Sequence, residues 1–128
     1  MRTEPIEIYI GREDYLCVFD YEEKIKRITP DFGILGELKS RGVIVTAKGN
    51  DVDYVCRFFA PAFGINEDQA TGSIQTTLTN YWSKKLNKKS LTGIQLSQRV
   101  GKFFTELQGD RVLISGQTKT YLTGEIEI

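Results

Sequence analysis

The feature that most constrains this chain is one apolar stripe at helical spacing, preceded by a polar loop that contains glycine. The stripe consists of Ile74, Leu78, Tyr81, Trp82 and Leu86. These positions follow i, i+4, i+7, i+8 and i+12, which predicts an amphipathic helix with a broad buried face. A helix that is apolar over so wide a stripe must be covered by other elements, and the surrounding sequence favours a sheet.

The rest of the chain alternates between short strand patterns and turns. We expect strands at residues 6–10, 15–19, 43–45, 54–59, 91–97, 103–107, 111–115, 119–122 and 125–128. Two short helices are expected at residues 20–28, capped by Asp20, and at residues 30–40, with Pro30 at the first helical position. Because many connections are short, the sequence predicts one α+β domain over residues 1–128, a mostly antiparallel β half-barrel wrapped around one central helix.

The start of the central helix offers a place for an anion. Thr71 is the predicted N-cap, and the backbone N–H groups of the next three residues then lack intrahelical partners. Free N–H groups and the positive end of the helix dipole attract a carboxylate or phosphate, and Gly72 has no side chain to obstruct it. The alternative is that these N–H groups bind only water, and spacing does not choose between the two.

Composition removes several classes of function. Lysine plus arginine and aspartate plus glutamate both total 17, so neither a nucleic acid nor a membrane surface is an expected partner. No apolar run reaches bilayer length and no basic leader opens the chain, so we expect a cytoplasmic protein. The absence of histidine removes Ser-His and Cys-His nucleophiles and the usual zinc spacings, so no metal is expected. Cys17 and Cys56 lie in apolar strand patterns and are expected to be buried thiols.

Several short motifs follow one another along the chain. They are Arg57, Phe59-Ala60-Pro61, Gly64, Glu67-Asp68, Thr71-Gly72-Ser73, Tyr81-Trp82, the run Gln-Leu-Ser-Gln-Arg at 95–99, and Arg111-Val112 with Gly116. In this order they resemble the PhzF-like phenazine-biosynthesis family, which implies the diaminopimelate-epimerase fold. Members of that family have two similar halves that face each other across the active site. The resemblance covers only the second half, and it implies that the first half, with its catalytic glutamate and Cys-Gly-His segment, is absent from this sequence.

The resemblance also implies roles for residues of the loop. It makes Asp68 an acidic catalytic residue, and it makes Gly72 and Ser73, with Thr71 beside them, the contacts of a substrate carboxylate. Asp68 has a simpler alternative role, because a carboxylate near a helix N-terminus stabilises the helix by about 0.3–1 kcal/mol. Glu67 is expected to be a solvated neighbour.

Other polar residues near these motifs have less specific expectations. Arg57 is either structural or directed at an anion. Gln69 stands where the family usually has proline, so the loop is expected to be less rigid. Gln95, Ser97 and Arg99 alternate along one strand and are expected to form an exposed polar face.

The activity implied by the resemblance is an isomerisation of a small carboxylic acid of the dihydro-hydroxyanthranilate type. A carboxylate at hydrogen-bond distance moves a proton between ring carbons, with no metal or organic cofactor, and the family's main base lies in the missing half. Three interpretations stay open. The chain is the C-terminal domain of such an isomerase, completed by the missing half or by a homodimer partner; or it is a non-catalytic module that binds small anions; or it is an oligomerisation domain.

Overall fold

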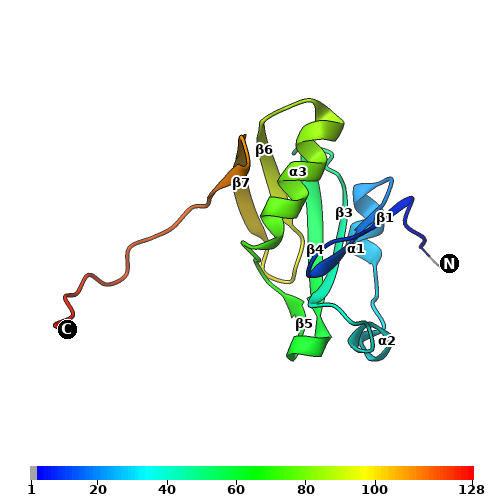
Figure 1. Cartoon of the computed structure of the whole chain (residues 1–128), viewed down its shortest axis with the longest axis horizontal. Helices are drawn as coiled ribbons and strands as arrows, with labels where there is room; N and C mark the ends of the chain where they lie inside the picture. The colour runs from blue at the N-terminus through cyan, green and yellow to red at the C-terminus, as the bar shows by residue number, and fades with distance from the viewer. Residues whose placement is uncertain (1–2) are drawn as a thin grey trace.

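The computed structural model describes residues 3–128, and its centre is an eight-stranded mixed sheet with helices on both faces (Figure 1). The strands are β1 (Glu7–Ile10), β2 (Asp14–Val18), β3 (Gly42–Lys48), β4 (Tyr54–Ala60), β5 (Ile65–Asp68), β6 (Ser90–Gln95), β7 (Gly101–Gln108) and β8 (Arg111–Ser115). They lie in the order β1-β2-β3-β4-β6-β7-β8, and β5 pairs with β4. The β2–β3 and β4–β6 pairs are parallel and the other pairs are antiparallel. The predicted α+β class is confirmed.

The two parallel pairs explain where the helices lie, because parallel neighbours need a crossover connection. The helices α1 (Glu22–Arg27) and α2 (Phe32–Gly36) lie between β2 and β3, and α3 (Ile74–Leu86) lies between β4 and β6. Successive side chains of a strand point to opposite faces. Accordingly Ile44 and Phe58 belong to the core that includes α3, whereas Val43 and Phe59 belong to a second core beneath α1 and α2. Each face of the sheet therefore has its own core.

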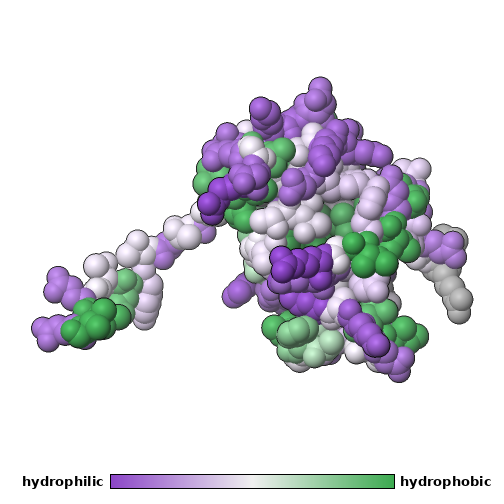
Figure 2. Space-filling model, viewed as in Figure 1, coloured by the Kyte–Doolittle hydropathy of each residue, from purple (hydrophilic) through white to green (hydrophobic). Residues whose placement is uncertain are grey.

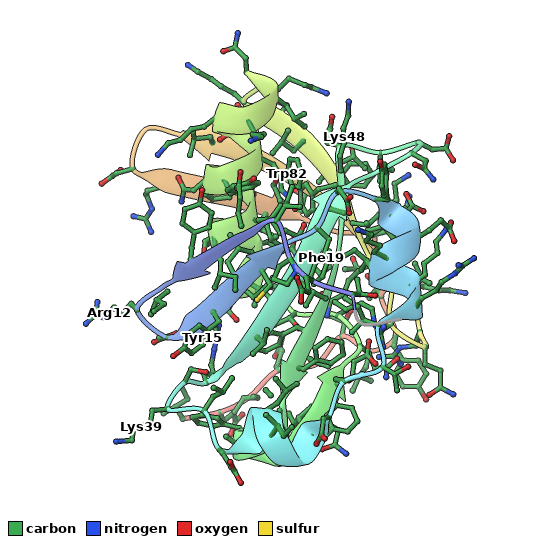
Figure 3. The ribbon with its side chains drawn as sticks, turned by 90° about the vertical axis from the view of Figure 1, so that its right-hand side faces the viewer. Arg12, Tyr15, Phe19, Lys39, Lys48 and Trp82 are labelled. Atoms are coloured by element: carbon green, nitrogen blue, oxygen red, sulfur yellow. The ribbon has the colours of Figure 1, made fainter. Side chains whose placement is uncertain are left out.

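The helix α3 presents the predicted stripe to the sheet. Ile74 and Leu78 are fully buried, and Trp82 is nearly so. The Trp82 indole N–H donates to the hydroxyl of Thr46 on β3, 3.0 Å away, which fixes the ring between α3 and the sheet (Figure 3). The opposite side of α3 is polar and exposed, for example at Asn80. The prediction of one dominant amphipathic helix is confirmed.

The two short helices differ from the predictions in length and in capping. α1 spans six residues, and Asp20 does not cap it, because its carboxylate pairs instead with Lys24 (2.6 Å). α2 spans five residues and begins after Pro30. Its cap is Asp31, whose Oδ1 accepts a hydrogen bond from the backbone N–H of Ile34 (3.1 Å). Within the described residues no helix is long and apolar enough to cross a membrane.

The last residues of the chain contradict the predicted strands at 119–122 and 125–128. Residues 116–128 form no strand and extend away from the sheet (Figure 1). Tyr121 and Ile126 are almost fully exposed. A strand requires a hydrogen-bonded neighbour, and this segment has none within residues 3–128.

Candidate functional site

The loop that leads into α3 lies at the end of the sheet where β4 finishes. After β4 ends at Ala60, the 3₁₀ turn η1 (Pro61–Phe63) and Gly64 reverse the chain. Gly64 has a φ of 80°, a left-handed conformation that glycine adopts without strain. The chain returns as β5, which pairs with β4 and ends at Asp68. β6 runs parallel to β4, so its last residue, Gln95, lies toward the same end of these strands. The topology thereby brings Asp68 and Gln95 together.

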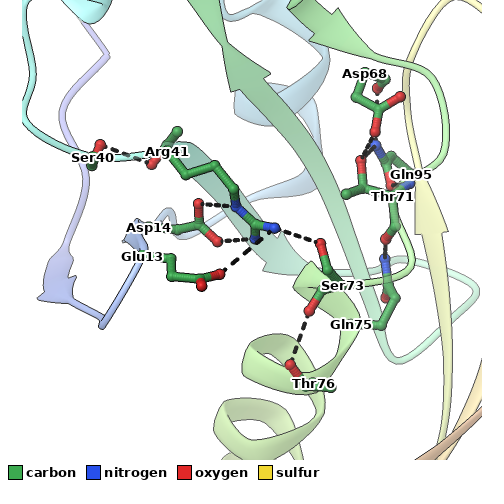
Figure 4. Close-up of polar contacts among 11 residues, drawn as sticks. Glu13, Asp14, Ser40, Arg41, Asp68, Thr71, Ser73, Gln75, Thr76 and Gln95 are labelled. Carbon is green, nitrogen blue, oxygen red and sulfur yellow. Dashed lines mark hydrogen bonds and ion pairs between the residues drawn. The ribbon is translucent and has the colours of Figure 1, made fainter. Parts of the chain in front are cut away.

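Thr71 is held at all of its polar groups. Its N–H donates to Gln95 Oε1 (2.8 Å), and its carbonyl accepts from Gln75 Nε2 (3.1 Å). Its hydroxyl donates to Asp68 Oδ2 (2.6 Å) and accepts from Gln95 Nε2 (3.0 Å) (Figure 4). The prediction that Thr71 is the N-cap of α3 is therefore wrong, because its hydroxyl is engaged by Asp68 rather than by the start of the helix.

Gln95 and Ser97 do not form an exposed polar face, contrary to the prediction. Gln95 is fully buried, and its Nε2 also donates to the Asp68 carbonyl (2.9 Å). Ser97 is buried, and its hydroxyl donates to the carbonyl of Gln69 (2.6 Å). The Gln69 side chain accepts from the backbone N–H of Arg99 (2.7 Å), and Arg99 itself is exposed. These side chains satisfy backbone groups of the loop, so the loop is fastened without the rigidity of a proline.

The hydrogen-bond network continues from Thr71 into the core. Gln75 connects Thr71 to Tyr54, because its Oε1 accepts the phenol hydroxyl of Tyr54 at 2.6 Å. Burial raises the pKa of Tyr54, so the phenol keeps its proton and remains a donor. Gly93 on β6 makes room for the ring, since a Cβ at Gly93 would lie 2.2 Å from it. The loop is thus connected to the middle of the sheet by buried neutral side chains.

Ser73 occupies the N-cap position of α3, but its side chain makes no capping bond. Its hydroxyl accepts a hydrogen bond from Arg41 Nη1 at 2.9 Å. The N–H of Gln75 bonds back to the carbonyl of Gly72 (3.0 Å), so the N–H groups of residues 72–74 precede the helical ladder. A Cβ at Gly72 would meet no heavy atom within 4 Å, so this position is open.

Arg41 and Asp14 form an ion pair that no pattern in the sequence predicted. The parallel register places Asp14 opposite Gly42, and therefore beside Arg41. Arg41 Nε donates to Asp14 Oδ1 (2.9 Å), and Arg41 Nη2 donates to Asp14 Oδ2 (Figure 4). The hydrogen bond to Asp14 raises the pKa of Arg41 above its ordinary value. The two residues are 27 positions apart, so only the parallel pairing of β2 with β3 would have connected them.

A small cavity of about 190 Å³ lies beside this ion pair. Its lining comes from the β1–β2 turn (residues 11–14), from Arg41, and from Ser73, Thr76 and Thr77 at the start of α3. Arg41 is positive, but the Asp14 carboxylate neutralises it, and Glu13 Oε2 lies 3.8 Å from Arg41 Nη1. Arg12 also lines the cavity, so two arginines and two carboxylates give the rim no net charge, and an anion would be held mainly by directed N–H and O–H donors.

Glu67 is not a solvated neighbour, contrary to the prediction. Arg57 Nε donates to Glu67 Oε1 (2.7 Å), and Arg57 Nη2 donates to Glu67 Oε2 (2.9 Å). Arg57 Nη1 also donates to the carbonyls of Ile25 and Ile28 at the end of α1. Arg57 is therefore structural, and together with Glu67 it ties β5 to β4 and to α1.

The turn of residues 68–73 presents two polar side chains, one near each end. Asp68 has one carboxylate oxygen fixed by Thr71, and Ser73 offers a hydroxyl at the start of α3. No group of three or more histidine, cysteine, aspartate or glutamate side chains gathers as a metal site in the part of the chain that the structure describes.

Comparison with known proteins identifies the family. The model of the PhzC-PhzF family, described as phenazine biosynthesis-like protein, matches residues 2–124. The chain belongs to this family, and the resemblance stated from its motifs is confirmed. An uncharacterized isomerase of Pseudomonas aeruginosa is 42% identical over 124 residues, which cover 97% of this chain and 48% of that protein. An uncharacterized isomerase of Halalkalibacterium halodurans is 42% identical over 123 residues, covering 93% of this chain and 46% of that protein.

Solved structures agree with the sequence comparison. A PhzF-family phenazine biosynthesis protein of Enterococcus faecalis superposes with a TM-score of 0.87 at 42% identity, over 94% of this chain and 48% of that one. A putative PhzC/PhzF protein of Clostridium difficile gives a TM-score of 0.85 at 35% identity, over 97% of this chain and 48% of that one. The chain spans about half the length of the relatives that it matches.

Proposed function

We propose that this chain is the C-terminal, substrate-holding domain of a PhzF-like isomerase. Its reaction is a cofactor-independent proton transfer by carboxylates on a small carboxylic acid of the dihydro-hydroxyanthranilate type. The observation that carries the proposal is that one turn, residues 68–73, holds both a fixed carboxylate and the open start of α3. Asp68 serves as an acid–base group, the Gly72 N–H and the Ser73 hydroxyl bind the substrate carboxylate, and Thr71 holds Asp68 in place.

The proposal includes a partner that completes the site. The relatives are about twice as long as this chain, and the resemblance assigns the main base to their other half. In the assembled protein the sheet would form a half-barrel around α3 and would face a second half of similar architecture. That half is either the missing N-terminal half or, in its absence, a second copy of this chain.

Exposed apolar side chains support an association of this kind. Ile6, Ile8 and Ile10 are between 59% and 77% exposed at the β1 edge. Figure 2 shows apolar residues on the extended C-terminal segment, whose exposed large hydrophobic residues include Leu122 and Ile126. Exposed apolar groups of this kind favour docking, so we expect the isolated chain to dimerise or to aggregate. Sedimentation at micromolar concentrations measures this, and a clean monomer throughout would contradict it.

The decisive test of the proposal is reconstitution of activity. Alone, the chain should not isomerise a dihydro-hydroxyanthranilate, because a positioned base contributes about 10²–10⁴-fold in rate and the main base is expected in the other half. Adding that half of a relative as a separate polypeptide should restore turnover. In the reconstituted pair, Asp68→Asn should lower kcat while preserving the fold, since it removes the carboxylate but keeps its shape.

Two results would overturn the assignment. Full activity of this chain alone would show that the main base lies within it. Undiminished activity of the Asp68→Asn pair would show that Asp68 only stabilises the loop and the helix. Thermal unfolding of both forms serves as the control, because a change in folding alone would lower activity by another route.

A further inference from the structure

We propose that Gln95 is a positioning residue, which acts through the hydroxyl of Thr71 to decide which oxygen of Asp68 is available for proton transfer. This inference rests on the proposed function, since it explains how the proposed acid–base group is held. It stands on four hydrogen bonds among these three residues, each between 2.6 and 3.0 Å. The Gln95 side chain that makes three of them is completely buried.

The chemistry of the donors fixes the direction of every bond. A backbone N–H can only donate, so the Gln95 atom that faces the N–H of Thr71 must be the oxygen Oε1. The amide nitrogen Nε2 then faces Thr71 Oγ1 and the Asp68 carbonyl, and it can only donate to both. Thr71 Oγ1 therefore accepts from Gln95, and its single proton is left for Asp68 Oδ2 at 2.6 Å.

This order leaves the two oxygens of Asp68 unequal. Oδ2 receives the Thr71 hydroxyl in a short bond to a carboxylate, whereas Oδ1 has no part in the Thr71–Gln95 network and is left for a substrate. Gln95 carries no charge and does not titrate, so its own part in this bond order does not depend on pH. A second hydrogen bond holds Thr71 in this position, because Gln75 at the start of α3 donates to the Thr71 carbonyl.

Four substitutions separate positioning from mere packing. Gln95→Glu keeps the shape, but a carboxylate cannot donate, so it competes with Asp68 for the Thr71 hydroxyl proton. Thr71→Val removes the hydroxyl with almost no change of volume, whereas Thr71→Ser keeps it. Gln98→Glu is the matched control, because Gln98 is exposed and lies three residues from Gln95 on the same segment.

The first measurement needs no ligand. The ¹³C NMR shift of the Asp68 carboxyl carbon reports the bond at Oδ2 in this chain alone. We expect it to move in Gln95→Glu and Thr71→Val, and to stay near its original value in Thr71→Ser and Gln98→Glu. An unmoved Asp68 resonance in Gln95→Glu and Thr71→Val would overturn the inference, and so would a Thr71→Ser variant that behaves as Thr71→Val does.

The second measurement is kinetic and uses the chain reconstituted with the complementary half of a relative. We expect Gln95→Glu and Thr71→Val to lower kcat by about ten- to hundredfold with little change in KM. A misdirected Asp68 carboxylate stabilises the transition state less but leaves substrate binding nearly unchanged. An unchanged kcat with a moved Asp68 resonance would overturn the kinetic role of Gln95. If the unsubstituted pair is inactive while the Asp68 resonance responds as expected, the proposed function fails and the positioning of Asp68 by Gln95 stands.

Discussion

The turn of residues 68–73 has two sides that are built by opposite means. On the Thr71 side, the buried neutral side chains of Gln75 and Gln95 form hydrogen bonds with the N–H, the carbonyl and the hydroxyl of Thr71. On the Ser73 side, the ion pair of Arg41 and Asp14 stands at the rim of a cavity beside an open glycine position. The loop is therefore held by buried side chains on its inner side and keeps free N–H groups on its outer side, as the proposed substrate-binding turn requires.

The two sides should also respond to different conditions. A buried neutral network costs free energy when one partner is removed, because the remaining donor or acceptor cannot reach water, and salt does not affect it. A partly exposed ion pair is screened by salt and contributes less. Stability measurements can therefore separate the two sides, and the expected effects decrease from the buried side to the open one.

The largest effect is expected from Gly93→Ala, on the buried side. The new Cβ would lie 2.2 Å from the Tyr54 ring, which is fully buried. Overpacking of this severity should lower the free energy of unfolding by about 3 kcal/mol or more, measured by urea denaturation. Gly72→Ala is the matched control, since its Cβ would meet nothing within 4 Å and its φ is not left-handed. Equal losses in both variants would show that the buried network is not what fixes the loop.

A smaller effect is expected from Asp14→Asn, on the open side. The Asp14 side chain is 7% exposed and that of Arg41 is 27% exposed, so this ion pair is partly buried. We expect a loss of about 1–2 kcal/mol in free energy of unfolding at low salt, and a smaller loss at 1 M salt, where the Debye length is about 3 Å. Glu13→Gln is the control, because Glu13 is mostly exposed and lies 3.8 Å away. A loss that is independent of salt would place this ion pair in the same class as the buried network.

The sequence predicted those parts of the molecule that depend on local pattern. The stripe of α3 and the strands β1 and β2 each follow from the spacing of residues within one segment, and the α+β class follows from such patterns together. The parallel pairs were not predicted, although they bring Asp14 to Arg41 and Gln95 to the loop. Period-two patterns identify strands but do not say which strands are neighbours, so contacts made across a crossover stay hidden.

The same limit explains the errors at the site itself. A threonine before a helix is a favoured N-cap, but Thr71 has a nearer partner in Asp68, so the local preference loses to a tertiary contact. Gln95 alternates with other polar residues as in an exposed strand, yet the loop covers it. In both cases the sequence shows a polar residue but does not show which distant residue it bonds to. Polar residues placed beside a functional loop are those for which pattern alone is least informative.

The smallest effect on stability is expected from Ser73→Ala. Ser73 is exposed, and its hydroxyl only accepts one hydrogen bond from Arg41, which keeps both of its bonds to Asp14 when the serine is lost. The free energy of unfolding should therefore change by less than about 0.5 kcal/mol. In the reconstituted pair, however, the same substitution should weaken substrate binding by about ten- to hundredfold, because it removes one hydrogen bond to a charged carboxylate. Asn80→Ala, on the exposed face of α3, should change neither quantity. If Ser73→Ala destabilised the chain as much as Asp14→Asn does and left binding intact, Ser73 would belong to the scaffold, and the contrast between a fixed inner side and a free outer side would be lost.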